Sequence, residues 1–312
     1  MTPTTVRRLL CATDLSPAAT PAWEEAQLLG ALFAAEVLLL HVVPPALPAP
    51  LDGSLPPSLV REVWEAGQRQ ARAGLDQLVG GLADPGLKVS ARIEEGSPAR
   101  RILEVAREDA VDLVVLGTNG RGRPRSVFLG SVADGVVRHA SCPVVTVPAR
   151  RGDAPPTSPQ LRRVCYATDF SAGARAAWPW VLAVAGAASA EVDLLHVTAA
   201  PVADPELPAE SIGRMARLLR AQGEAEAERF LRACPLPADR VHVVLGSGVV
   251  AEQILHVARE RGADLIAMGT HGWSGLLRWT LGSIAHHVVQ TAPVPVLTVG
   301  PGSRSEEGAD AA

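Results

Sequence analysis

A chain of 312 residues is long enough for two domains of about 150 residues each. Apolar residues make up 47% and charged residues 20% of the sequence, which is typical of a soluble globular protein. The net charge of −4 and the 4% of aromatic residues argue against nucleic acid or an anionic membrane as a partner. No run of ~18 apolar residues is free of charged or helix-breaking residues, so we expect a cytoplasmic protein without a membrane span.

Hydrophobic patterning predicts strands that alternate with helices through the first half. Strands are expected at 8–12, 36–43, 88–94, 113–116 and 143–147, and helices from residue 16, at about 58–80, at 98–108 and at 131–138. Ser16 is expected to cap the first helix, with Pro17 at its first position. In the helix 98–108, Ile102 and Val105 should face inward. This alternation predicts a doubly wound parallel sheet of five strands, whose ligands bind at the carboxyl ends of the strands.

The sequence repeats itself in order. The segment ATDLS at 12–16 returns as ATDFS at 167–171, and LHV at 40–42 returns at 195–197, both at an offset of 155. GT at 117–118, GS at 130–131 and PV at 143–144 return at an offset of 152. Two constant offsets indicate a single gap, either in the Pro-rich segment 44–57 or in the helix that follows it. At these offsets Cys11 of the first repeat aligns with Tyr166 of the second and not with Cys165. This argues against a redox site that is present in both repeats.

The four cysteines show neither a CxxC spacing nor the density of a disulfide framework. Buried free thiols in a reducing compartment are therefore expected. The cysteines are Cys11, Cys142, Cys165 and Cys234.

Composition also predicts the domain boundaries. Residues 149–160 are rich in proline, glycine and serine and read as a linker between domains at 1–148 and 161–300. Residues 301–312 are small, polar and acidic and are expected to be a disordered tail.

A glycine pattern follows the fourth predicted strand of each half. In the first half Gly117 and Gly120 are followed, after nine residues, by Gly130 and Ser131, and the second half repeats the same count. Glycine at the end of a strand lets a ligand approach the backbone without a clash against Cβ. The Gly-Ser pair then opens a helix, where free N–H groups and the helix dipole favour phosphate. The repeated spacing therefore favours a phosphate-binding site in each half.

The doubled pattern G-x2-G-x9-G-[ST] resembles that of the universal stress protein family. The segments ADLIAMGTHG at 263–272, LGSIA at 281–285 and APVPV at 292–296 also look like this family, as do the A-T-D-x-S segments. The resemblance covers about residues 5–148 and 161–300. It implies a tandem two-domain member of the ATP-binding type, with two Rossmann-like sheets of the adenine nucleotide alpha hydrolase-like kind.

The resemblance also implies an ATP site in each half, with Mg²⁺ as an optional companion. The aspartate after the first strand would contact adenosine, the residue at the end of the second strand would border adenine, and the glycines and serines would approach ribose and phosphates. The site predicted in the first half comprises Ala12, Thr13, Asp14, Val42, Leu116, Gly117, Asn119, Gly120, Arg121, Gly130, Ser131 and Val132. The site predicted in the second half comprises Ala167, Thr168, Asp169, Val197, Met268, Gly269, His271, Gly272, Gly282, Ser283 and Ile284.

The two halves depart from the family pattern in different ways. Asn119 stands where the family often has the histidine that the second half keeps as His271. The nine-residue spacer of the first half carries Arg121 and two further arginines, which either bind phosphate or solvate a loop. The spacer of the second half is apolar and tryptophan-rich, as a contact surface would be. The halves are therefore expected to differ in affinity.

Three functions remain open from the sequence. The preferred one is an ATP-binding regulator or protective factor in a stress response. The second is slow ATP hydrolysis or phosphoryl transfer at the same site, although no Walker-type lysine follows the glycines. The third is an interaction scaffold that binds no nucleotide. No metal site is expected, because the adjacent His286 and His287 would point in different directions from a helix.

Assembly is predicted from the fifth strand of each half. Members of the family commonly pair through this strand, so the resemblance implies that 144–147 pairs with 296–299 to give an intramolecular pseudo-dimer. Such pairing would cover two exposed strand edges. Dimerisation of the whole chain is left open.

Overall fold

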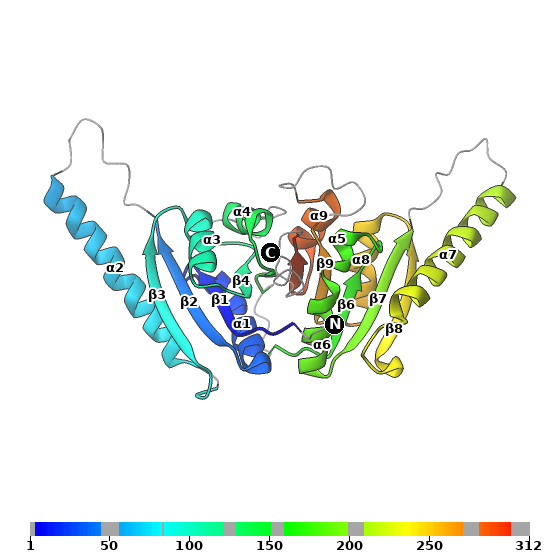
Figure 1. Cartoon of the computed structure of the whole chain (residues 1–312). Helices are drawn as coiled ribbons and strands as arrows, with labels where there is room; N and C mark the ends of the chain where they lie inside the picture. Colours follow the sequence, from blue (N-terminus) through cyan, green and yellow to red (C-terminus); the bar gives the residue numbers. More distant parts are fainter. Residues whose placement is uncertain are drawn as a thin grey trace, which may run out of the picture. The chain divides into compact units, whose positions relative to one another are not determined.

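A computed structural model describes residues 4–44, 56–82, 84–120, 129–150, 159–198, 209–270 and 281–300 of the chain (Figure 1). The chain divides into two compact units, with the boundary between Pro159 and Gln160. The predicted linker 149–160 lies mostly outside the described residues, and the predicted tail 301–312 lies wholly outside them. Within the described residues, no helix is both long enough and apolar enough to cross a membrane.

The first half is a doubly wound α/β unit (Figure 1). Its strands are β1 (Arg8–Thr13), β2 (Glu36–Val43), β3 (Val89–Glu95), β4 (Leu113–Gly117) and β5 (Val144–Val147). Its helices are the short 3-10 helix η1 (Pro17–Ala19), α1 (Thr20–Phe33), α2 (Pro57–Gly80), α3 (Pro98–Glu108) and α4 (Ser131–His139). These bounds confirm the predicted alternation, and most differ from the expected ones by one residue.

The strands of the first half lie in the order β3-β2-β1-β4-β5, and every pair is parallel. From β1 to β3 the chain adds strands toward one edge of the sheet, and from β4 to β5 it adds them toward the other edge. Because crossovers between parallel strands are right-handed, α1 and α2 therefore lie on one face of the sheet and α3 and α4 on the other. The core strand β4 is fully apolar and buried on both faces. The strand order switches direction between β1 and β4, where ligands of such sheets bind.

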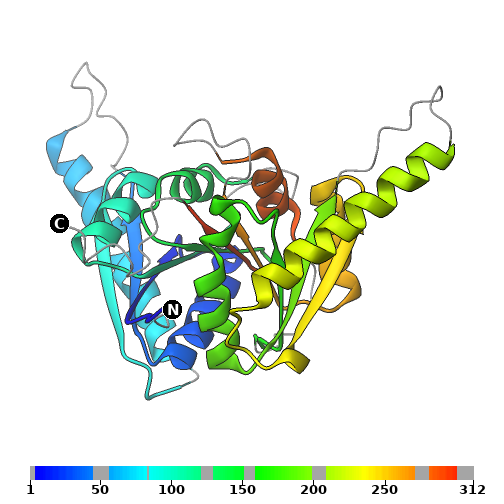
Figure 2. The same cartoon turned by 45° about the vertical axis from the view of Figure 1, so that its right-hand side comes forward.

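The second half repeats this arrangement. Its strands are β6 (Arg163–Ala167), β7 (Glu191–Thr198), β8 (Val241–Ser247), β9 (Leu265–Gly269) and β10 (Val296–Val299). Its helices are α5 (Ala172–Arg175), α6 (Trp178–Ala188), α7 (Ala209–Leu231), the 3-10 helix η2 (Ala238–Arg240), α8 (Val250–Glu260) and α9 (Ser283–Thr291). The order is β8-β7-β6-β9-β10, again parallel throughout, and α7 lies across β7 and β8 (Figure 2). Pairing of β5 with β10 stays a prediction.

The register confirms how the repeat aligns. Cys11 pairs with Leu39 and Val115, and Tyr166 pairs with their equivalents in the second half. β2 and β7 begin 155 residues apart, whereas α2 and α7 begin 152 residues apart. The gap in the repeat therefore lies between the second strand and the long helix, and the helix itself contains no gap.

Two local expectations need correction. Ser16 begins a 3-10 helix instead of capping an α-helix, and its hydroxyl makes no cap hydrogen bond. Its hydroxyl donates to Asp14 Oδ1 over 2.6 Å, because the carboxylate is the nearer and stronger acceptor. In the second half Ser171 does act as a side-chain cap, since its hydroxyl accepts from the N–H of Ala174. Of the four thiols, Cys234 is only half-buried, and the other three are buried as expected.

Candidate functional site

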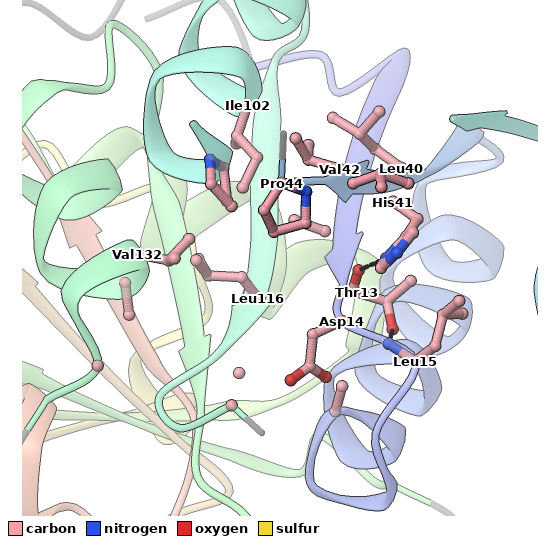
Figure 3. Close-up of a pocket in the computed structure, with 18 of the residues that line it drawn as sticks. Thr13, Asp14, Leu15, Leu40, His41, Val42, Pro44, Ile102, Leu116 and Val132 are labelled. Atoms are coloured by element: carbon pink, nitrogen blue, oxygen red, sulfur yellow. Dashed lines mark hydrogen bonds between the residues drawn. The ribbon is translucent and has the colours of Figure 1, made fainter. Parts of the chain in front are cut away.

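A pocket of about 440 Å³ opens at the carboxyl ends of β1, β2 and β4 in the first half (Figure 3). Helices α2 and α3 and the start of α4 complete its walls. This is the position of the topological switch, and the volume falls in the range of pockets that hold small molecules, roughly 300–1,000 Å³. The side chains of Leu40, Val42 and Ile102 give it an apolar end (Figure 3).

The turn that leaves β1 holds Asp14 at the edge of this pocket. Leu15 has φ 61°, a left-handed conformation that is uncommon for a leucine. Its N–H donates to Thr13 Oγ1 over 3.0 Å, which fixes the turn (Figure 3). Asp14 Oδ1 accepts from both the N–H and the hydroxyl of Ser16, at 3.0 and 2.6 Å. The carboxylate is therefore held in one orientation from the end of β1.

His41 ties β2 to the end of β1. Its Nδ1 lies 2.8 Å from the carbonyl oxygen of Thr13, and its ring is 7% exposed (Figure 3). A carbonyl oxygen only accepts hydrogen bonds, so Nδ1 carries the proton in this contact. His196 makes the same contact with Thr168 in the second half, at 2.9 Å. Both histidines therefore have a structural role at the strand ends.

The glycines of the pattern stand where side chains would clash. A Cβ at Gly120 would lie 2.9 Å from Asp14 Oδ2, and one at Gly130 would lie 3.0 Å from the carbonyl oxygen of Thr118. The N–H of Gly130 donates to that same carbonyl over 2.9 Å, which closes the loop between β4 and α4. Gly282 and Thr270 repeat this closure at the same distance. The spacing of the motif therefore reflects one backbone geometry used twice.

Helix α4 begins at the pocket with Gly130 as its N-cap. No side chain makes a cap hydrogen bond there, and the first-turn N–H groups of any helix lack partners within the helix. The described lining residues include no lysine or arginine, and Asp14 is the sole carboxylate among them. Backbone N–H groups, the hydroxyl of Ser131 and the helix dipole are thus what this part of the pocket offers to an anion.

The wall formed by α2 was not foreseen from the sequence. Gly67, Gln70 and Ala71 line the pocket from this helix. A Cβ at Gly67 would meet nothing within 4 Å, so the glycine leaves open space in the pocket. Ala71 and Leu75 are buried, and small residues at 67, 71 and 74 share that helical face. This run of small residues was the signal that could have located the wall.

All but one of the residues predicted for the first site line this pocket. They are Ala12, Thr13, Asp14, Val42, Leu116, Gly117, Asn119, Gly120, Gly130, Ser131 and Val132. Arg121 and the other two spacer arginines lie outside the described residues.

The predicted residues of the second half occupy equivalent strand and helix ends. Ala167, Thr168, Met268 and Gly269 are buried, Asp169, Val197 and Gly282 are half-buried, and Ser283 and Ile284 are exposed. His271, Gly272 and the apolar spacer lie outside the described residues. Among the segments that the structure describes, no cluster of three His, Cys, Asp or Glu side chains is placed to hold a metal ion.

These features define a class of protein: a tandem of two doubly wound α/β units with a ligand pocket at the switch point of the first. The model of the universal stress protein family matches residues 5–148 and 160–300. The chain belongs to the universal stress protein family.

Known relatives extend over both halves. A universal stress protein of Mycolicibacterium smegmatis is 27% identical over 277 residues, which cover 86% of this chain and 88% of that protein. One of Mycobacterium tuberculosis is 30% identical over 224 residues, covering 69% and 70% of the two chains. The crystal structure of a universal stress protein from Archaeoglobus fulgidus matches 94% of this chain with a TM-score of 0.63 at 22% identity, a likeness that concerns the fold alone.

Proposed function

We propose that the first half binds an adenine nucleotide, ATP alone or with Mg²⁺, and that the chain acts as a nucleotide-dependent regulator or protective factor in a stress response. Membership of the universal stress protein family supports the stress-response role. The observation that carries the nucleotide proposal is the composition of the pocket: an apolar end, a fixed carboxylate and a helix N-terminus surround one cavity of about 440 Å³.

The nucleotide would lie along the carboxyl edge of the sheet. Its base would contact Val42, Leu40 and Ile102 at the apolar end, where burial of a flat apolar ring is favourable. Its ribose hydroxyls would donate to the carboxylate of Asp14. Its phosphates would reach past Gly117 and Gly120 to the start of α4, where N–H groups and the helix dipole favour negative charge.

The described contacts of the pocket leave slow hydrolysis as the second candidate function. Asp14 Oδ1 accepts two hydrogen bonds from Ser16, and Nδ1 of His41 donates to the carbonyl of Thr13. A general base must have an acceptor directed at the attacking water. With Nδ1 protonated, Nε2 is the acceptor nitrogen of the His41 ring, so phosphate release by the wild-type chain is the measurement that separates binding alone from hydrolysis.

The proposal is tested by the variant Gly130→Asp in the full chain, with ATP binding measured by equilibrium dialysis. A carboxylate at the start of α4 would repel phosphate and crowd the carbonyl of Thr118, so we expect at least a tenfold loss of affinity. The backbone itself permits the change, since φ of Gly130 is −61°.

Gly186→Asp is the matched control, because it adds the same charge at an exposed helical glycine with open space around it. We expect this control to bind ATP as the wild-type chain does. Full affinity in Gly130→Asp, or no binding by the wild-type chain, would refute the proposed function.

A further inference from the structure

The two halves keep the apolar end of the pocket but differ at two further positions. Leu195, Val197 and Ile254 stand at the equivalents of Leu40, Val42 and Ile102. Leu15 and Gly67 line the pocket of the first half. At the offsets of the repeat, 155 for the first strands and 152 from the long helix onwards, their equivalents are Phe170 and Leu219. A phenyl ring and an isobutyl group thus replace a leucine and an open glycine.

Phe170 is packed into an aromatic cluster of the second half. Its side chain is 8% exposed, whereas Leu15 is half-buried. Its ring centroid lies 4.9 Å from that of His196 and 5.7 Å from that of Phe230. Pairs at such distances are favourable beyond their buried area alone, so the ring is held in place.

Arg175 contacts two members of this cluster. Its Nε donates to the carbonyl oxygen of Phe170 over 2.8 Å, and its guanidinium carbon lies 5.1 Å from the ring centroid of Phe230. The hydrogen bond holds the backbone of Phe170, and the cation–π contact falls on Phe230, whose ring packs against that of Phe170. Thr20 stands at this position in the first half and has no guanidinium to offer.

The long helix also lies close to the sheet in the second half. A Cβ at Gly223 of α7 would lie 3.1 Å from Cδ2 of His196, so the imidazole ring rests against the helix backbone. Ala71 is the equivalent residue of α2 and lines the pocket. A pocket of about 170 Å³ lies beside α7. Leu219 and Gly223 line it together with residues of β7 and β8, and none of the residues predicted to bind ATP does.

The glycine at the end of β9 is covered by the chain's own backbone. A Cβ at Gly269 would lie 2.4 Å from the carbonyl oxygen of Gly173 in α5, and Gly269 is buried. At Gly117 the nearest atom outside its own loop, the carbonyl oxygen of Ala18, would be 3.8 Å away, and Gly117 is half-buried. The backbone that follows the first strand therefore lies closer to the strand-end glycine in the second half than in the first.

One helix start of the second half has lost a hydroxyl. Val249, just before α8, is 62% exposed and takes the place of Ser97. An exposed aliphatic side chain offers phosphate no hydrogen bond. At the start of α9, by contrast, Ser283 keeps the hydroxyl of Ser131, and Ile284 replaces Val132.

We propose that the chain binds one nucleotide, in the first half, and that the second half is a filled, nucleotide-free copy of the site. Phe170 and Leu219 stand where the first half has Leu15 and Gly67, and α5 lies closer to Gly269 than the equivalent backbone lies to Gly117. This inference rests on the proposed function of the first half. The residues at positions 15 and 67, and at the equivalent positions 170 and 219, then decide which half binds the nucleotide.

The test counts bound ATP per full-length chain by equilibrium dialysis with radiolabelled ATP, in the wild type and in three variants. Gly67→Leu gives the first half the residue of the second, and Gly80→Leu makes the same change in the same helix away from the pocket; both glycines have open space around them. Gly282→Asp damages the second half alone. We expect one ATP per chain in the wild type, Gly80→Leu and Gly282→Asp, and at least a tenfold loss of affinity in Gly67→Leu.

Thermal unfolding of each variant separates a filled pocket from a misfolded chain, and Leu15→Phe is a second filling variant with the same expected loss. Two ATP per chain in the wild type, or a lowered count in Gly282→Asp, would overturn this inference and leave the proposed function standing. A folded Gly67→Leu and a folded Leu15→Phe that both bind normally would overturn the role of these positions. No binding by the wild-type chain would overturn the proposed function itself.

Discussion

Asp14 serves two purposes at the scale of single residues. Its carboxylate accepts the N–H and the hydroxyl of Ser16, and it lines the pocket at the point where β1 ends. The turn that it closes holds Leu15 at φ 61°, a conformation that costs a non-glycine residue about 1–2 kcal/mol. The hydrogen bonds of the turn offset that cost.

Asp14→Ala should therefore lower both stability and affinity. Loss of the two hydrogen bonds to a charged acceptor should reduce the free energy of unfolding by about 1–2 kcal/mol, given that the turn is partly exposed. Asp14→Asn keeps a carbonyl acceptor for the N–H of Ser16 and should lose less than half as much. Urea unfolding and ATP titration of both variants check this, and equal losses in the two would argue against the turn geometry.

The buried thiols should be chemically inert. Burial raises the pKa of Cys11, Cys142 and Cys165 to about 12, so at pH 8 only about one thiol in 10,000 is a thiolate. Cys234 is half-buried. We expect a thiol-reactive disulfide reagent to label one cysteine in the native chain and four in urea. Rapid labelling of two or more native cysteines would contradict this.

The same raised pKa values have a consequence for stability. Unfolded thiols ionise near pH 9, whereas the three buried ones stay protonated until about pH 12. The unfolded state therefore loses protons first, so the stability that is present below pH 9 falls as the pH rises toward 12.

At the scale of elements, the apolar pattern predicted most boundaries, because the central strands are buried on both faces, whereas β3 and β8 are partly exposed. β2 and α3 begin and end where the sequence placed them, and Ile102 and Val105 of α3 are buried. The start of α1 differed because Ser16 found a carboxylate acceptor two residues away, which a capping rule does not weigh. The wall of α2 was missed because no motif marks it.

The replacement of Leu15 by Phe170 was equally hard to interpret from the sequence. Leucine and phenylalanine at positions 15 and 170 are both apolar, so hydrophobic patterning treats them alike. The effect of the larger phenylalanine side chain on the site can be judged only when the residues of α2 and α7 that line each site are known. The glycine spacing, which depends on backbone geometry alone, is the same in both halves and predicted a site in each of them.

The second strand of the two halves differs at one buried position, which is Asp193 in β7. It is fully buried and pairs with Arg163 at 3.2 Å and with Arg261 at 2.8 Å. The first half has Leu38 at the equivalent position. A buried ion pair is weak evidence for stability, but removing one partner leaves uncompensated charge.

We expect Asp193→Ala to reduce the free energy of unfolding by about 2–3 kcal/mol, discounted because both arginines are partly exposed. Asp193→Leu restores the residue of the first half and buries a side chain, so it should lose at least 1 kcal/mol less. Chemical denaturation measures both values. A leucine variant as unstable as the alanine variant would show that the arginines cannot reach water.

At the scale of the whole molecule, duplication kept the fold and changed the sites. Both halves have the same strand order, the same glycine closure and the same histidine contact at the end of the second strand. They differ where Phe170, Leu219 and Val249 of the second half replace Leu15, Gly67 and Ser97 of the first. One half is therefore free to bind a ligand, while the other can contribute stability or contacts.

The measurement that tests this account most directly is calorimetric titration of ATP into the nucleotide-free wild-type chain. The account predicts saturation at one ATP per chain, with a negative heat-capacity change from burial of the base against the apolar end of the pocket. Saturation at two would show that the second half accommodates a nucleotide despite Phe170 and Leu219. An absence of binding heat at several temperatures would contradict the nucleotide pocket altogether.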